Sequence, residues 1–245
     1  MAAEQLGQID KPSASQYMGK KILFLAPLLQ KIPSIPQDGR GTLQISSSAE
    51  EGEKILKEYW KQVDAQIDNL ERGLGPVARV YHEYIEEGGD PGIEILRSTG
   101  VGSVEITESR CAKGATFTQM EDRELLAATM DWELYLKQLL SFPFRSAAVT
   151  KHLHEWHAET IRARYDYMLQ SIIDSLSVDE PGIIFISENH QMQFPADIQV
   201  FYVSPPGLTD YKRWMEDLQA TLQAEAETSS HQTPDEASKE SENKS

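Results

Sequence analysis

The fold is decided by the segment Gly182-Ile183-Ile184-Phe185-Ile186-Ser187, in which large apolar side chains follow one another without a polar break. A short uninterrupted apolar run predicts a strand that is buried on both faces of a sheet. Lys21–Leu25 has the same character and ends near Pro27, which cannot donate a hydrogen bond to a sheet. Ile198–Val203 predicts a further strand after a polar link, so the sequence predicts a sheet with a buried centre.

Two further segments predict strands from weaker signals. Thr42–Ser46 precedes the most regular helical pattern, and Ser103–Glu108 alternates apolar with polar residues as Val104-Glu105-Ile106-Thr107. Alternation of this kind is typical of a strand with one buried face. With these segments the predicted sheet contains about four or five short strands.

A long amphipathic helix is predicted from Ser48 to Leu74. Ser48 and Glu51 have the spacing of a capping box, in which two side chains satisfy unpaired N–H groups at a helix start. Apolar residues then recur at steps of three and four, which places them on one face, here called the 56–74 stripe. The stripe consists of Leu56, Trp60, Val63, Ile67, Leu70 and Leu74.

Other helical patterns cover most of the remaining chain: Val77–Glu87, Asp122–Leu140, Ser146–Leu176 and Thr209–Leu222. Gly88-Gly89 closes the first and Pro143 stops the second, because these residues do not continue a helix. The predicted fold class is a mixed α/β (α+β) domain, with a small sheet and several long amphipathic helices.

The two ends of the chain differ in composition from its middle. Residues 1–17 are mostly small and polar, and we expect a flexible lead-in there. In 223–245 alanine is the only apolar residue type and acids are frequent, so the segment cannot bury enough surface to offset its ordering entropy. We therefore expect a single mixed α/β domain over 18–222, followed by a disordered acidic tail.

Net charge and cysteine content exclude several classes of function. The chain has 39 Asp and Glu against 23 Lys and Arg, a formal charge of −16 that repels phosphate, so we expect no nucleic-acid partner. A single cysteine, Cys111, excludes an intrachain disulfide and any site with several cysteine ligands. No stretch approaches the ~18 apolar residues that a membrane span needs. We expect a soluble cytoplasmic protein with no membrane partner.

The helix predicted over Ser146–Leu176 carries polar residues where apolar ones are expected. His157, Thr160 and Arg164 interrupt its apolar face between Leu153 and Met168. A charge at such a position must find a partner or keep water, because burying it alone costs several kcal/mol. The line of polar residues is either an internal ion pair with a snorkelling arginine or part of a ligand site.

A second polar group, Ser187-Glu188-Asn189-His190-Gln191, follows the most apolar strand. Polar residues at the carboxyl end of a strand are common site residues, because the strand holds them and the loop exposes them. Glu188 and His190 could supply a carboxylate and an imidazole for acid–base work, and His190 with His157 could bind a metal ion. The alternative is an ordinary polar hairpin tip between two strands.

The order Arg164-Tyr165, Met168, Ile172, Leu176, followed by Gly182–Ile186 and then His190, resembles the closing part of the TraB/Tiki and erythromycin-esterase-like group. In that group an arginine-bearing helix leads into a strand with a histidine at its end. The similarity covers roughly 30 residues, as judged from these positions alone. The resemblance implies a metal-dependent or acid–base hydrolase, with Arg164 and His190 as matching positions. The opening half-site of the group, Gly-x-x-His or Gly-Glu-x-x-His after the first strand, is missing, and Ala26-Pro27-Leu28 stands there.

The sequence thus leaves two functional hypotheses. The first is a soluble acidic interaction or regulatory protein without a complete catalytic motif, which binds a protein partner or a second copy through the 56–74 stripe. The second is a metal-dependent or acid–base hydrolase with its site near 187–191. The candidate catalytic residues of that hydrolase are His157, Arg164, Glu188 and His190, and the sequence identifies no cofactor.

Overall fold

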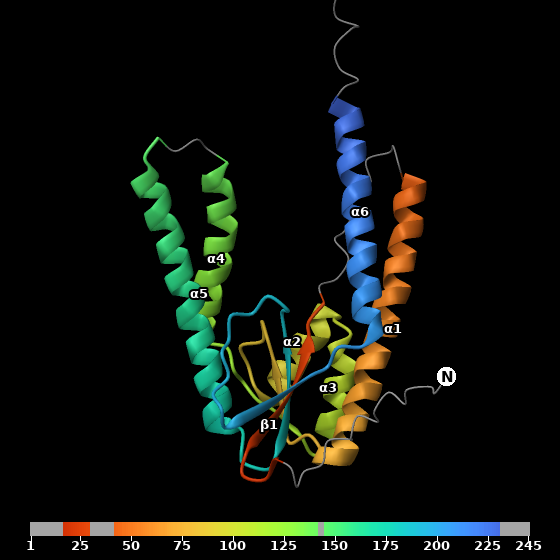
Figure 1. Cartoon of the computed structure of the whole chain (residues 1–245), viewed down its shortest axis with the longest axis vertical. Helices are drawn as coiled ribbons and strands as arrows, with labels where there is room; N and C mark the ends of the chain where they lie inside the picture. Colours follow the sequence, from red (N-terminus) through yellow and green to blue (C-terminus); the bar gives the residue numbers. More distant parts are fainter. Residues whose placement is uncertain (1–16, 30–41, 142–144, 231–245) are drawn as a thin grey trace, which may run out of the picture. The chain divides into compact units, whose positions relative to one another are not determined.

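The computed structural model describes residues 17–29, 42–141 and 145–230 (Figure 1). Within these residues the chain forms six helices and a five-stranded parallel sheet, a mixed α/β fold as predicted. The elements follow in the order β1 (Lys21–Pro27), α1 (Thr42–Leu74), β2 (Arg79–His82), α2 (Gly89–Thr99), α3 (Ser103–Ala112), β3 (Thr116–Phe117), α4 (Arg123–Leu140), α5 (Ala147–Ser175), β4 (Pro181–Ile186), β5 (Ile198–Tyr202) and α6 (Pro206–Ser230).

The sheet has the strand order β3-β2-β4-β1-β5, and every neighbouring pair is parallel. β4 lies in the middle, with Ile184 opposite Leu25 of β1 on one side and Tyr81 of β2 on the other. All of its residues are buried, which explains why its sequence is apolar without alternation. The carboxyl ends of all five strands meet at one edge of the sheet, because the strands are parallel.

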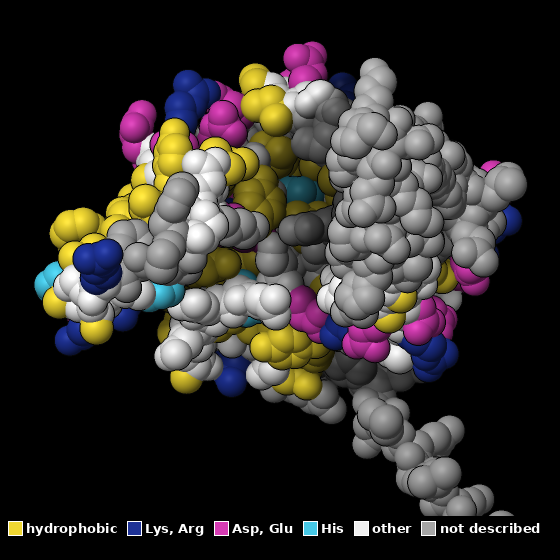
Figure 2. All heavy atoms as spheres, turned by 90° about the horizontal axis from the view of Figure 1, so that it is seen from above, with side chains coloured by type: hydrophobic (Ala, Val, Ile, Leu, Met, Phe, Trp, Pro, Cys, Tyr) yellow, Lys and Arg dark blue, Asp and Glu magenta, His cyan; other side chains and the backbone are white. Residues whose placement is uncertain are grey.

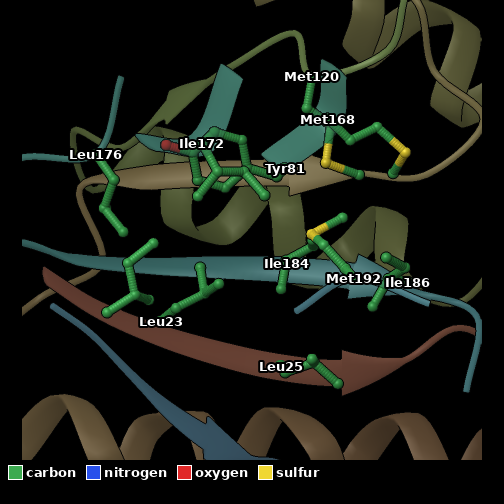
Figure 3. Close-up of a cluster of buried hydrophobic side chains, with 11 residues drawn as sticks. Leu23, Leu25, Tyr81, Met120, Met168, Ile172, Leu176, Ile184, Ile186 and Met192 are labelled. Atoms are coloured by element: carbon green, nitrogen blue, oxygen red, sulfur yellow. The ribbon is translucent and has the colours of Figure 1, made fainter. Parts of the chain in front are cut away.

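Helices cover both faces of the sheet. On one face, α5 contributes Met168, Ile172 and Leu176 to a cluster that also contains Leu23 of β1 and Ile184 of β4 (Figure 3). On the other face, the α1 residue Trp60 packs edge-on against Phe185 of β4, with ring centroids 6.0 Å apart. Alternate residues of each central strand therefore meet α5 and α1.

The chain divides into two compact units. The first consists of 1–31 and 60–204 and contains the whole sheet, and the second consists of 32–59 and 205–245. In the second unit α6 lies against the first part of α1, where a Cβ on Gly52 would come within 2.3 Å of the Trp214 ring. The absence of a side chain at Gly52 therefore permits this close approach. α6 continues to Ser230, so the first part of the expected tail 223–245 is helical, and the rest of the tail lies outside the described residues, as does 1–16.

Several sequence-based predictions are confirmed by the elements. The strands expected at Lys21–Leu25, Gly182–Ser187 and Ile198–Val203 are β1, β4 and β5. The helices expected over Asp122–Leu140 and Ser146–Leu176 are α4 and α5, whose N-caps are Asp122 and Ser146. α4 and α5 lie side by side as an antiparallel hairpin (Figure 1).

Three predictions of secondary structure are wrong. Thr42–Ser46 is not a strand, because α1 already begins at Thr42, and the capping-box residues therefore lie inside the helix. Val77–Glu87 is not a helix but contains β2, where Val80, Tyr81 and His82 are all buried in the sheet. Ser103–Glu108 is not a strand but lies in α3, whose buried residues Ser103, Ile106, Thr107 and Arg110 have helical spacing.

The hairpin considered between β4 and β5 is also wrong, because both strands run parallel to β1 and lie on opposite sides of it. The last helix starts at Pro206, a residue whose fixed backbone angle suits the first turn, rather than at Thr209. No helix within the described residues has the length and apolar character needed to cross a membrane.

Four of the six side chains of the 56–74 stripe are buried. Val63 and Ile67 have no exposed surface, Leu74 is 2% exposed and Trp60 is 6% exposed. These four side chains belong to the core, whereas Leu56 and Leu70 are half-buried. Binding of a partner through the stripe stays a prediction. The regular spacing of the stripe reflects the packing of α1 on its own sheet.

Candidate functional site

A crevice is expected at the carboxyl edge of the sheet between β2 and β4. The connection after β2 leads through α2 and α3 to β3, on the far side of β2 from β4. The connection after β4 leads in the opposite direction, across β1 to β5. In open parallel sheets ligands bind where two adjacent strands send their connections apart, because the loops separate there. Glu83 directly follows β2 and Ser187 directly follows β4, so both stand at this point.

Three buried charged groups meet at this edge, and we call Glu83, Glu121 and Arg164 the carboxylate–arginine cluster. Arg164 projects from α5, and its Nε donates to Oε2 of Glu121 over 2.9 Å. Its Nη2 lies 3.4 Å from Oε1 of Glu83 and also donates to Oε1 of Glu121. Glu83 and Glu121 have no exposed surface and Arg164 is 3% exposed, so water does not screen these charges. Arg164 thus forms the internal ion pair that was one of the two alternatives for the polar line in its helix.

Ser187 connects the cluster to the surface. Its backbone N–H and its hydroxyl both donate to Oε2 of Glu83, each over 2.6 Å. Its Oγ also lies 3.3 Å from the hydroxyl of Tyr84, in an exposed contact. Glu83 therefore faces Arg164 with one carboxylate oxygen and a half-buried hydroxyl with the other.

Tyr84 has an unusual backbone conformation. Its φ is 71°, in the left-handed region that bulky residues rarely occupy. The conformation directs its backbone N–H to Oε1 of Glu121, over 3.0 Å. Its ring lies 5.1 Å from Cζ of Arg164, and the side chain is 39% exposed. Strain of this kind costs about 1–3 kcal/mol and concentrates at functional sites.

The surroundings of Glu83 shift its pKa upward from the ordinary carboxyl value. Burial raises the pKa of Glu83, and the negative charge of Glu121 adds to the rise, while the hydrogen bonds from Ser187 and the charge of Arg164 oppose it. Two carboxylates share one guanidinium, and Glu121 makes the closer contacts with it.

The neighbouring groups are also perturbed. Burial alone would lower the pKa of Arg164, but its hydrogen bond to Glu121 and the charges of both glutamates raise it, so Arg164 keeps its charge. Burial and the charge of Glu83 raise the pKa of Tyr84 and of Tyr165. Both phenols are therefore hydrogen-bond donors at neutral pH.

A cavity of about 580 Å³ lies next to the cluster, between α5 and the loop that follows β4. Its lining residues are Arg162, Tyr165, Asp166, Leu169, Gln191, Met192 and Gln193. The Tyr165 ring has its centroid 5.7 Å from Cζ of Arg164, so Tyr165 borders both the cavity and the cluster. The cavity offers space for a small molecule beside the buried charges.

The other sequence-predicted site residues lie in α5 and in the loop after β4. His157 is half-buried in α5, two turns before Arg164 or about 10 Å along the helix. Glu188 is exposed in the loop after β4. His190 is half-buried in the same loop, with its ring against Phe194, and burial lowers its pKa. The contacts of Arg164 described above join it to Glu83, Glu121, Tyr84 and Tyr165.

Two histidine nitrogens are enclosed without a hydrogen-bond partner, Nε2 of His157 and Nδ1 of His190. In the part of the chain that the structure describes, no three histidine, cysteine, aspartate or glutamate side chains gather in a way that could hold a metal ion. The metal-binding role of His157 and His190 stays a prediction.

Sequence reasoning did not identify Glu83 and Glu121. Glu83 was assigned to the interior of a helix, and Glu121 precedes the N-cap of α4. A weak signal for Glu83 exists, because Val80 and Tyr81 form a short apolar run that only His82 separates from Glu83. Glu121 has no comparable signal, since it follows a strand of two residues.

Comparisons with protein-family models, with curated proteins and with solved structures found no match to this chain.

Proposed function

We propose that the protein is a hydrolase of the acid–base type that acts at the carboxyl edge of the sheet, with Glu83 as the acid–base group. The observation that carries the proposal is the convergence of Glu83, Glu121, Arg164 and Ser187, from two strand ends, a loop and a helix, at the switch point between β2 and β4. Of the two forms of hydrolase inferred from the sequence, this arrangement supports the acid–base form.

Glu83 has the properties that general acid–base catalysis requires. A catalytic carboxyl works best when its pKa lies near the working pH, and burial shifts the pKa of Glu83 in that direction. Arg164 and Glu121 act as positioning residues, because Glu121 holds the guanidinium of Arg164, which in turn contacts Oε1 of Glu83 and leaves Oε2 for the reacting groups.

The site differs from a purely structural ion pair in two respects. An ion pair that only ties a helix to a sheet needs neither the strained backbone of Tyr84 nor a hydroxyl that leads from the buried carboxylate to the surface. Perturbed carboxyls in clefts are candidates for function because chemistry needs such groups and stability alone does not.

The experiment compares ester hydrolysis by the wild type and by Glu83→Gln, with p-nitrophenyl acetate, butyrate and octanoate as probes. Loss of a general acid–base group lowers the rate by about 10²–10⁴-fold, and we expect a loss in this range. Glu86→Gln is the matched control, because Glu86 is a half-buried carboxylate three residues away that pairs with Arg123 at the surface. Equal rates in the wild type and Glu83→Gln would refute the proposal, as would a wild type no faster than buffer on all three esters.

A second candidate function, self-association as an interaction protein, is supported by one observation on the α4–α5 hairpin. Large apolar side chains are exposed along it: Met130, Leu134, Tyr135, Val149 and Trp156. Figure 2 shows hydrophobic side chains among basic ones and histidines on the side where this hairpin lies. Light scattering over a range of protein concentrations tests the idea, and Trp156→Lys should weaken any dimer. A strict monomer at all concentrations would remove this candidate.

A further inference from the structure

We propose that Ser187 is the nucleophile of the reaction and that it forms a covalent acyl intermediate with the substrate. The inference rests on the proposed function but goes further, because Glu83 could instead activate a water molecule. The substrate class is then an ester of a carboxylic acid, whose carbonyl carbon the serine oxygen attacks.

The position of Ser187 suits a nucleophile. It directly follows β4, whose residues are buried in the centre of the sheet, so its backbone is held in place. Its hydroxyl lies at the switch point and is half-buried, with the exposed Tyr84 hydroxyl on one side and Glu83 on the other. The exposed side of Oγ is therefore the one next to the Tyr84 hydroxyl.

The contact between Ser187 and Glu83 has the geometry of a nucleophile and its base. Oγ donates to Oε2 of Glu83 over 2.6 Å, within the 2.6–3.2 Å range of such pairs. A third group orients the base, as in other activated nucleophiles, because Nη2 of Arg164 lies 3.4 Å from the other oxygen of Glu83. The backbone N–H of Ser187 also donates to Oε2, which fixes the carboxylate and the hydroxyl relative to each other.

The proposed reaction has two balanced halves. In the first, a bond forms between Oγ of Ser187 and the carbonyl carbon, the serine proton moves to Oε2 of Glu83, and the bond to the alcohol oxygen breaks. The departing alcohol takes the proton from Glu83. In the second, a water oxygen bonds to the acyl carbon and gives a proton to Glu83, the bond to Oγ breaks, and Oγ recovers the proton. Carboxylic acid and alcohol are released, and no oxidant or other co-reactant is required.

Neighbouring hydroxyls can assist the first half. Tyr84 keeps its proton at neutral pH and lies 3.3 Å from Oγ, so it can donate a hydrogen bond to an oxygen that gains negative charge at that place. Tyr84 therefore has a defined part in the proposal, and its strained backbone holds it there.

The test uses an alkyl fluorophosphonate, which reacts with activated serines through a new Oγ–phosphorus bond and loss of fluoride. The full-length chain is incubated with the reagent, and intact mass followed by peptide mapping locates the adduct. We expect one adduct, on Ser187, none in Ser187→Ala, and labelling at least about 100-fold slower in Glu83→Gln. Ser177→Ala, a change of an exposed serine, is the matched control and should be labelled like the wild type. An unlabelled wild type, or an adduct elsewhere, would overturn the assignment.

Ester hydrolysis by the same variants separates failure of this inference from failure of the proposed function. If Ser187→Ala keeps the wild-type rate while Glu83→Gln loses it, water is the nucleophile, so the role of Ser187 is wrong and the hydrolase proposal stands. If Glu83→Gln keeps the rate, the hydrolase proposal itself fails. Circular dichroism and thermal melting confirm that each variant is folded, which Ser187→Ala should be, because the backbone N–H contact to Glu83 remains.

Discussion

The first unit contains two buried arginines, and only one of them belongs to a candidate site. Arg110 of α3 is 1% exposed and pairs with three carboxylates, which we call the α1 clamp: Asp64, Asp68 and Glu71. Arg164 is 3% exposed and pairs with the two carboxylates of the carboxylate–arginine cluster. Both interrupt an otherwise apolar environment, so burial of a guanidinium does not by itself distinguish a site from a structural contact.

The partners of the two arginines differ. The acids of the α1 clamp come from successive turns of one helix, and the side chains of Asp64 and Asp68 are 43% and 47% exposed. Glu83 directly follows β2, Glu121 lies in the loop between β3 and α4, and neither has exposed surface. A charge whose partners reach water can be compensated by solvent if the pair breaks, whereas one with buried partners cannot. The second arrangement is costly to maintain, and it stands at the switch point between β2 and β4.

The largest expected effect on stability is that of Arg164→Met. The change leaves two buried carboxylates without a cation, and breaking such a pair costs about 3–5 kcal/mol. Urea denaturation measures the loss in the free energy of unfolding. The double variant Arg164→Met/Glu121→Gln should recover part of the loss, because it removes one of the stranded charges. A loss below about 1 kcal/mol in the single variant would show that the cluster is hydrated.

Truncation of a buried apolar side chain on α1 should have the next largest effect on stability. Ile67 has no exposed surface, and Ile67→Ala should lower the free energy of unfolding by about 2–4 kcal/mol. Lys57→Ala, on an exposed position of the same helix, should change it by less than about 0.5 kcal/mol. Calorimetry or urea denaturation measures both changes. Equal losses in the free energy of unfolding for the two variants would mean that the stripe does not hold α1 in place.

A smaller loss is expected from Arg110→Met. The acids of the α1 clamp are partly exposed and water can solvate them, so we expect a cost of about 1–2 kcal/mol and no change in ester hydrolysis. The same denaturation and hydrolysis assays apply. If Arg110→Met lowers the free energy of unfolding as much as Arg164→Met does, exposure of the partner acids does not reduce the cost of losing the arginine. The two arginines would then not differ in energetic terms.

The pH dependence of stability should reveal Glu83. Because its pKa is raised in the folded state, the folded protein holds this proton more tightly than the unfolded chain. Stability therefore falls as the pH rises from about 4.3, the unfolded value, through the folded pKa, by at most about 1.4 kcal/mol per pH unit. Unfolding curves between pH 4 and 8 should show this decline in the wild type and a reduced one in Glu83→Gln. The rate of hydrolysis should rise over the same range, since the base must be ionised.

The smallest effect on stability is expected at Tyr84. Asparagine adopts the left-handed backbone more readily than tyrosine, so in Tyr84→Asn the relief of strain offsets the lost ring contact with Arg164. We expect the free energy of unfolding to change by less than about 1 kcal/mol, while fluorophosphonate labelling of Ser187 slows. Unchanged labelling would show that Tyr84 takes no part in activating the serine.

The sequence predicted the elements in which burial follows one simple pattern along the whole element. β4 is apolar without interruption because both of its faces are buried. α5 shows helical spacing of its apolar residues because only one of its faces is buried. The segment around β2 was misjudged because Val77, Tyr81 and Ile85 also fit a helical period, and only the pairing with β4 resolves the ambiguity. Ser103 and Thr107 in α3 are buried polar residues, so a pattern based on apolar residues did not register the helix.

For the site, the sequence predicted the arginine but not its partners. Arg164 was identified because a charge within an apolar helical face demands an explanation. Glu83 and Glu121 lie far from it along the chain, and their approach depends on the strand order, which no local pattern encodes. Ser187 was part of the predicted strand-end group, and its contact with Glu83 follows from the same strand order.

The central place of β4 also has a consequence for the synthesis of the protein. β1 pairs only with β4 and β5, both of which lie near the far end of the chain. While the polypeptide emerges from the ribosome, the very apolar β1 therefore remains without a neighbour until β4 has been translated. Such delayed pairing slows folding and leaves an unpaired strand edge that is prone to aggregation. We expect the nascent chain to depend on chaperones until its last third has left the exit tunnel.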